Sequence, residues 1–291
     1  MKLNKRGLLA VLGVLVLSLR LVAMPLVLLV LDARPSSFRS RFTRDRDALL
    51  ARPVPPAPVV TETDLASLPP LMQTYLRHVG AVGRPRVYNM RVVFNAQMRS
   101  SATSPWMQST ATQYEFFAPP ARLFYMNAAL FGVPLDIFHR YIDSAATFQV
   151  RIASLFSMVD KGGPVLTRAE TVTLMNDIVV MAPAAVLDLP FTWETIGERS
   201  LLATFTNAGN TVSGVLTFDG GGDLVGFLSN DRTQEDTNGS RNVPWSTPIS
   251  GYRDVDGIRV GTHGDANWVD TTGEWTYGTF DIRSIAYNVD R

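Results

Sequence analysis

The sequence predicts an α+β fold: a curved, mostly antiparallel, half-barrel-like β-sheet with two helices packed on or across it, preceded by one N-terminal transmembrane helix. Three observations predict this class. An uninterrupted apolar run occupies residues 8–31. Most of residues 61–291 alternates apolar and polar side chains with the period of two that is typical of half-buried strands. Short turns join consecutive strands, which favours antiparallel pairing.

The apolar run at residues 8–31 predicts a membrane-spanning helix. It contains 24 residues with one charge, Arg20, and one proline, Pro25. At 1.5 Å per residue it reaches about 36 Å, which exceeds a hydrocarbon core of roughly 30 Å. The competing interpretation is a cleavable signal peptide, because basic residues precede the apolar run. No small-x-small cleavage site follows it, which favours an uncleaved anchor.

Charge divides the chain into two parts. Residues 1–52 hold ten basic and three acidic side chains, a net charge of +7, whereas the remaining residues hold 17 basic and 23 acidic ones, a net charge of −6. We therefore divide the chain into a basic N-terminus (1–7), the transmembrane helix (8–31), a basic and then proline-rich linker (32–60) and an antiparallel β-rich domain (61–291). The positive charge lies in a tail, which argues against a nucleic-acid partner.

The arginines that follow the apolar run predict contact with anionic lipid headgroups. They are Arg34, Arg39, Arg41, Arg44 and Arg46. Basic residues before the run favour a single-pass protein of the inner (cytoplasmic) membrane with its domain on the extracytoplasmic side. The arginines after the run count toward the opposite orientation, so both topologies stay open.

Two helices are predicted in the folded domain. The first begins at Pro69 and Pro70 and ends at Gly80, while the second begins at a capping box formed by Thr167 and Glu170 and runs to about residue 180. The strands predicted before the second helix are 86–99, 106–117, 122–130, 134–143 and 147–155. Strands return from residue 192, and the parity of apolar residues in the last strand predicts a β-bulge near Ser284.

The sequence contains no motif that establishes a reaction. It has no cysteine, no HExxH, no GxSxG and no phosphate-binding glycine motif. We therefore predict no catalytic residue, no metal ligand and no cofactor. An enzyme stays open as the weakest alternative, in the form of a hydrolase-like site near His139 and Asp143 or near Asp231 and Arg232.

Aromatic side chains on the predicted strands favour an apolar ligand instead. A curved sheet that carries many of them can enclose a cavity for a lipid-like molecule. The predicted ligand-binding residues are Phe94, Tyr114, Phe124, Phe138, Tyr141, Trp193, Trp245 and Trp268. The alternative is a solid core, in which case the chain is a structural or interaction protein of the cell envelope.

Residues 68–288 resemble a bacterial family known as a domain of unknown function. The matching positions include Leu68-Pro69-Pro70, Tyr75-Leu76-Arg77, Gln113-Tyr114, Pro119-Pro120, Arg168–Asp177, Ala182-Pro183-Ala184, Trp193-Glu194, Asp231-Arg232, Pro244-Trp245, Tyr252-Arg253, Asp256–Arg259, Trp268 and Tyr277. Two departures are Val260-Gly261-Thr262, where Ile-Pro-Thr is expected, and Leu123-Phe124, where a tryptophan is usual. The resemblance implies no established reaction. In outline the fold is also similar to lipoprotein carriers, an analogy that carries no function with it.

Overall fold

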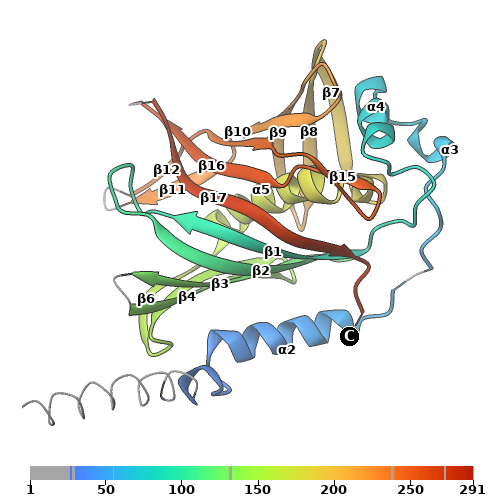
Figure 1. Ribbon diagram of the computed structural model, residues 1–291. Coiled ribbons are helices and arrows are strands. Elements are labelled where there is room, and N and C mark those ends of the chain that lie inside the picture. The colour runs from blue at the N-terminus through green and yellow to red at the C-terminus, as the bar shows by residue number, and fades with distance from the viewer. Residues whose placement is uncertain are drawn as a thin grey trace, which may run out of the picture.

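One antiparallel sheet of 13 strands organises the described chain (Figure 1). The computed structural model describes residues 27–290 except 28, 29, 55, 131, 132, 237, 238 and 272. The strand order is β6-β5-β4-β3-β2-β1-β17-β16-β13-β10-β9-β8-β7. The first six strands are β1 (Asn89–Met98), β2 (Met107–Phe117), β3 (Pro120–Leu130), β4 (Val133–Ile142), β5 (Ala145–Ile152) and β6 (Phe156–Gly162).

The second half of the sheet comes from the C-terminal part of the chain. Its strands are β7 (Phe191–Gly197), β8 (Ser200–Asn207), β9 (Asn210–Phe218), β10 (Leu224–Ser229), β13 (Trp245–Ser250), β16 (His263–Asp270) and β17 (Gly273–Tyr287). Two small hairpins stand apart from it: β11 (Thr233–Asp236) with β12 (Gly239–Asn242), and β14 (Arg253–Val255) with β15 (Ile258–Val260). Strand β17 pairs with β1 and so joins the two halves of the sheet.

Helix α5 (Pro164–Met181) crosses the concave side of the sheet, between the β1–β6 layer and the layer that contains β8–β10 (Figure 1). Thirteen of its residues are buried, and its Val172, Met175 and Ile178 belong to the main hydrophobic core. A helix that is buried on nearly all sides needs neighbouring elements on all sides, which cover its apolar residues and pair its polar ones. The two layers of the curved sheet provide that cover.

Helix α4 (Pro70–His78) confirms the first predicted helix, with Pro70 in its first turn and positive φ at Gly80 after its end. Tyr75 of this helix packs on Phe218 at 5.2 Å between ring centroids. The short helices α3 (Glu62–Leu65) and η1 (Pro183–Leu187) flank the domain core.

The predicted capping box at Thr167 and Glu170 is wrong. Helix α5 begins earlier, at Pro164, because proline suits a first turn in which an amide has no helical partner. Thr167 therefore lies inside the helix, where its Oγ1 donates to the Gly163 carbonyl at 2.9 Å. Glu170 is buried and faces the interior rather than the helix end.

The predicted bulge near Ser284 is confirmed. Val93 pairs with Ser284 and Phe94 pairs with Ile282, so one residue of β17 has no partner between them. The extra residue restores the parity, because a single-residue insertion moves the following side chains to the other face. Both Ile282 and Ile285 are therefore buried in the main core.

The middle part of the predicted basic and proline-rich linker, residues 32–60, is a helix packed on the sheet rather than a connecting segment. Residues 38–50 form α2 (Phe38–Leu50), which lies along the convex face of β3 and β4 (Figure 1). Phe38, Phe42 and Leu49 are buried against that face. Their spacing places all three on one side of a helix, and burial of this stripe outweighs the repulsion among the arginines.

Two further differences from the prediction concern strand β6 and the apolar run at residues 8–31. Strand β6 at the sheet edge was not predicted; six of its seven residues, Phe156 and Met158 among them, are exposed, so the strand shows no alternation of buried and exposed side chains. The predicted transmembrane helix at residues 8–31 lies almost entirely outside the described residues. Within the described part of the chain, no helix is long and apolar enough to cross a membrane.

Candidate ligand-binding site

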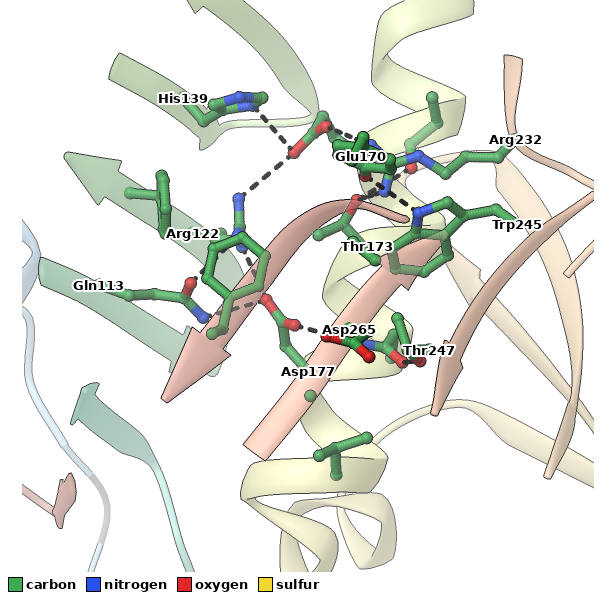
Figure 2. A pocket seen from close by; sticks show the side chains of 18 of the residues that line it. Gln113, Arg122, His139, Glu170, Thr173, Asp177, Arg232, Trp245, Thr247 and Asp265 are labelled. Atoms are coloured by element: carbon green, nitrogen blue, oxygen red, sulfur yellow. Dashed lines mark hydrogen bonds and ion pairs between the residues drawn. The ribbon is translucent and has the colours of Figure 1, made fainter. Parts of the chain in front are cut away.

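A cavity of about 380 Å³ lies between α5 and the concave face of the sheet (Figure 2). Most of its lining is apolar, with Phe94, Phe280 and Ile282 from the sheet and Val180 and Met181 from the helix. The volume falls in the range of roughly 300–1,000 Å³ that is usual for small-molecule sites. The space is therefore large enough for a ligand rather than a single water molecule.

Four of the eight predicted ligand-binding residues line this cavity: Phe94, Phe124, Trp245 and Trp268. For Phe124, strand register explains which polar residues lie beside it at the cavity. Phe124 pairs with Gln113 of β2 and with His139 of β4, and side chains of directly paired residues project from the same face.

The other four residues lie elsewhere. Tyr114 and Phe138 belong to the opposite face, where they pack under α2. Phe138 and Tyr141 are three residues apart on one strand, so they cannot share a face. Tyr141 lies in the packed core and accepts a hydrogen bond from Asn207 Nδ2 at 2.8 Å. Trp193 stacks on Phe191 of the edge strand β7, at 5.2 Å.

A buried polar cluster forms one wall of the cavity, and Arg122 is its centre (Figure 2). Arg122 Nε lies 2.8 Å from Asp177 Oδ2, and Nη2 donates to Gln113 Oε1 at 3.0 Å. Its Nη1 lies 3.4 Å from Glu170 Oε2. Burial lowers the pKa of Arg122, but the surrounding carboxylates outweigh burial and raise it above its ordinary value. Arg122 therefore stays charged.

Glu170 connects three cationic or ionisable partners. Besides Arg122, its Oε2 lies 3.4 Å from His139 Nδ1 and its Oε1 lies 3.5 Å from Arg232 Nη2. Burial acts to raise the pKa of Glu170. Its neighbours His139, Arg232 and Arg122 act in the opposite direction and hold the pKa well below its usual range. Glu170 is thus a buried carboxylate in its ionised form.

Glu115 behaves in the opposite way. It is fully buried, and its Oε1 accepts a hydrogen bond from Gln113 Nε2 at 2.9 Å. Burial, followed by the nearby Asp177 carboxylate, raises the pKa of Glu115 well above its ordinary value. Adjacent buried carboxyl groups resist double ionisation, so one proton is retained within this pair.

Arg232 supplies the polar group on the far side of Glu170. Its Nη1 donates to Thr173 Oγ1 at 2.7 Å. The guanidinium carbon lies 4.4 Å from the Trp245 ring centroid and 5.8 Å from that of Trp268. The two indoles therefore hold the guanidinium by cation–π contacts at the cavity wall.

Three lining residues carry a buried polar atom that has no hydrogen-bond partner among the described residues. These atoms are His139 Nδ1, Arg232 Nε and Asp265 Oδ1. Buried polar atoms are nearly always paired, and leaving one unpaired costs roughly 1–3 kcal/mol. His139 Nδ1 lies 3.4 Å from Glu170 Oε2 and Asp265 Oδ1 lies 3.5 Å from His263 Nε2, so both still face an ionisable partner. Arg232 Nε has no such contact among the described ion pairs and is therefore the atom available to a polar group from outside the chain.

Neither predicted hydrolase-like pair forms a site. Asp143 lies in a turn with a φ of 52°, and its Oδ1 lies 3.4 Å from Arg52 Nη2. His139, in contrast, lines the cavity. Asp231 Oδ1 forms an ion pair with Arg168 Nη2 at 2.6 Å. The next residue, Arg232, pairs with Glu170 instead. Adjacent residues of an extended segment point to opposite sides, which separates Asp231 from Arg232. Asp143 is separated from His139 because it lies in the turn after β4 rather than on the strand. His139 and Arg232 do meet, but through Glu170.

Sequence reasoning missed Arg122, Glu170 and Asp177. A signal for them was present in helical spacing, because positions 170, 173 and 177 share one face of a helix. Three polar residues on one face of a helix indicate either a solvent-exposed face or a buried polar site. The strands that cover this face, among them β3 with Arg122, bury the three residues, and no local pattern predicts that cover.

Comparison with known proteins identifies a family. Residues 58–280 match a family described as "Family of unknown function (DUF6544)", which confirms the predicted resemblance to a domain of unknown function. No curated protein matches the chain.

Solved structures with a similar outline share little sequence. A putative outer membrane lipoprotein-sorting protein domain from Vibrio parahaemolyticus is 9% identical, with a TM-score of 0.41 over 75% of this chain and 91% of that one. A LolA superfamily protein from Nitrosomonas europaea is 9% identical, with a TM-score of 0.37 over 76% and 94%. A DUF1329 family protein from Desulfovibrio piger is 10% identical, with a TM-score of 0.34 over 75% and 92%.

Proposed function

The chain belongs to DUF6544, a family of unknown function, and we propose that its domain binds an apolar or amphiphilic ligand between α5 and the sheet. The observation that supports this proposal is a cavity of about 380 Å³ with a mainly apolar lining and, on its wall, the Arg232 Nε atom without a hydrogen-bond partner among the described residues. An acyl chain fits the apolar part. An oxygen-bearing group of the same molecule accepts from Arg232 Nε and satisfies it.

The polar wall supports a ligand of low net charge. The two arginines, Arg122 and Arg232, are already balanced by the carboxylates of Glu170 and Asp177. A second full charge would have to be desolvated without a counter-charge, which is costly. The ligand class is therefore an acyl-chain amphiphile whose polar group hydrogen-bonds at the wall.

Photocrosslinking tests this binding in the full chain. The probe is a monoacylglycerol, an uncharged amphiphile, with a diazirine on its acyl chain, added to membranes that contain the protein. We expect crosslinked peptides from the cavity lining, such as those with Phe94 or Phe280. Ala169→Phe fills the space beside Glu170, since Ala169 lines the cavity and is buried. It should abolish that labelling, and the exposed-loop variant Ala102→Phe should not.

Equal labelling of the cavity peptides in both variants would contradict the proposal, as would labelling restricted to residues outside the cavity. Thermal unfolding of each variant separates a filled cavity from an unfolded chain. A side chain that fills a cavity strains the fold less than the same side chain forced into a well-packed core, where the cost is about 1–3 kcal/mol.

We also propose single-pass attachment to the inner membrane through residues 8–31, with the domain extracytoplasmic and with Arg34, Arg39, Arg41, Arg44 and Arg46 near anionic headgroups. The support is the length of the apolar run and the basic residues that flank it. Because the chain has no cysteine, Ala102→Cys provides a single reporter. Labelling by a membrane-impermeant maleimide in spheroplasts supports this topology, and labelling only after lysis contradicts it.

A further inference from the structure

The outer end of the β5–β6 hairpin exposes large apolar side chains. Phe156 is 68% exposed and Met158 is 58% exposed, and Leu155 in the connecting turn is also exposed. An isolated exposed apolar residue needs no explanation, but a contiguous group at a sheet edge marks an interaction surface. We name these three residues the hairpin tip.

The chain enters the described fold beside the hairpin tip. Arg34 Nη2 lies 3.4 Å from the Ser154 carbonyl oxygen, and Arg151 Nη1 donates to the Ser36 carbonyl at 2.8 Å. Figure 1 shows the β5–β6 turn next to the start of α2. The apolar run of residues 8–31 ends three residues before Arg34, and Val30 near the end of that run is exposed.

Basic side chains surround the hairpin tip. Arg151 lies over the Phe38 ring at 4.2 Å, and Arg41 donates to Gln149 Oε1 at 2.8 Å. The acidic groups nearby are Asp32, which pairs with Arg39 at 2.7 Å, Asp160, which accepts from Gln149, and Asp136, which accepts from Ser154 of the turn; these three face the four arginines Arg34, Arg39, Arg41 and Arg151. Arg34, Arg41 and Arg151 lack a carboxylate partner among the described ion pairs, so the surroundings carry net positive charge.

We propose that the hairpin tip inserts into the surface of an anionic lipid bilayer and seats the domain on it. Apolar side chains ringed by arginines match the boundary between acyl chains and negative headgroups. The same hairpin continues to the cavity, because the paired residues Phe148 and Lys161 both line it. Insertion therefore places the β5–β6 wall of the cavity next to the bilayer. The inference rests on the proposed attachment through residues 8–31.

Single-cysteine labelling tests the insertion, since the chain has no native cysteine. Full-length Phe156→Cys carries a nitrobenzoxadiazole label and is reconstituted in vesicles of phosphatidylglycerol and phosphatidylethanolamine. The matched control is Ile196→Cys on β7, 48% exposed at the opposite edge of the sheet. We expect a blue shift at position 156 and loss of most of its emission when the vesicles contain spin-labelled lipid. Position 196 should keep its aqueous emission.

The outcomes separate this surface from the other proposals. Flotation with the vesicles but no lipid quenching at position 156 overturns the inserted hairpin and leaves attachment intact. A blue shift without lipid quenching indicates a protein partner and also overturns it. Loss of flotation overturns both attachment and insertion. Ligand binding in the cavity is read separately, by crosslinking.

Discussion

Arg122 Nε on β3 and Asp177 Oδ2 on α5 lie 2.8 Å apart, and both side chains are buried. The pair joins the helix to the sheet at the wall of the cavity. Gln113 Nε2 donates to the same Asp177 oxygen at 3.0 Å, so that carboxylate is held by two strands. The charged wall is therefore built into the connection between the two layers of the fold.

Removing the Arg122 guanidinium should strongly destabilise the domain. We expect Arg122→Met to lower the free energy of unfolding by about 3–5 kcal/mol, because the carboxylates of Asp177 and Glu170 lose their buried partner. Urea denaturation of the full chain measures the loss. The exposed Arg91→Met on β1 should stay within about 0.5 kcal/mol of the native chain. Equal stability of the two variants would show that the buried pair is not structural.

Glu115 should make stability fall as the pH rises. Its folded pKa lies above the unfolded one, so the folded state binds the proton more tightly and loses this advantage above pH about 4.3. Glu115→Gln removes the effect. We expect its stability relative to the native chain to increase by up to ~1.4 kcal/mol per pH unit in that window.

Denaturation curves between pH 4 and 8 check this dependence. The matched control is Glu194→Gln on β7, an exposed carboxyl that should leave the pH profile of stability unchanged. If Glu115→Gln and the native chain run parallel across this range, Glu115 is not protonated in the folded state.

Arg232 should matter for an amphiphilic ligand. We expect Arg232→Met to reduce crosslinking of the diazirine monoacylglycerol by about tenfold, since a hydrogen bond to a charged group is worth ~1.5–3 kcal/mol. The ligand oxygen would lose the Nε donor that lacks a partner among the described residues. Arg199→Met, at an exposed site, should label normally. Undiminished labelling in a folded Arg232→Met variant would place the polar group of the ligand elsewhere.

Helix α2 should be held on the sheet by Phe42. Its ring lies 5.6 Å from that of Tyr125 and 6.1 Å from that of Phe138. We expect Phe42→Ala to cost about 3–5 kcal/mol in the stability of this contact. Faster amide hydrogen exchange of residues 38–50, with unchanged exchange in α5, is the signature. Arg44→Ala on the exposed side should leave exchange as it is, and a uniform change across the domain would exclude local release.

Most of the strands and both domain helices were predictable from the sequence, because alternation and helical patterns act through neighbouring residues, although the start of α5 was predicted too late in the chain and β6 was missed. The parity change near Ser284 belongs to this group, since it follows from counting apolar positions along a single strand. The four cavity aromatics were also identified, together with four that lie elsewhere. Alternation separates the two faces of a strand but does not say which face borders a cavity.

The sequence by itself determined the antiparallel strands, the lack of cysteine chemistry and the apolar N-terminal run. Tertiary structure decided the roles of Glu170 and Phe42. In the sequence pattern Glu170 resembles a helix-capping residue, but in the fold it pairs with Arg122 and Arg232. Phe42 belongs to a basic segment of the sequence, but in the fold it is buried against the convex face of β3 and β4. Burial and charge pairing depend on residues distant in the chain, so no local pattern contains them.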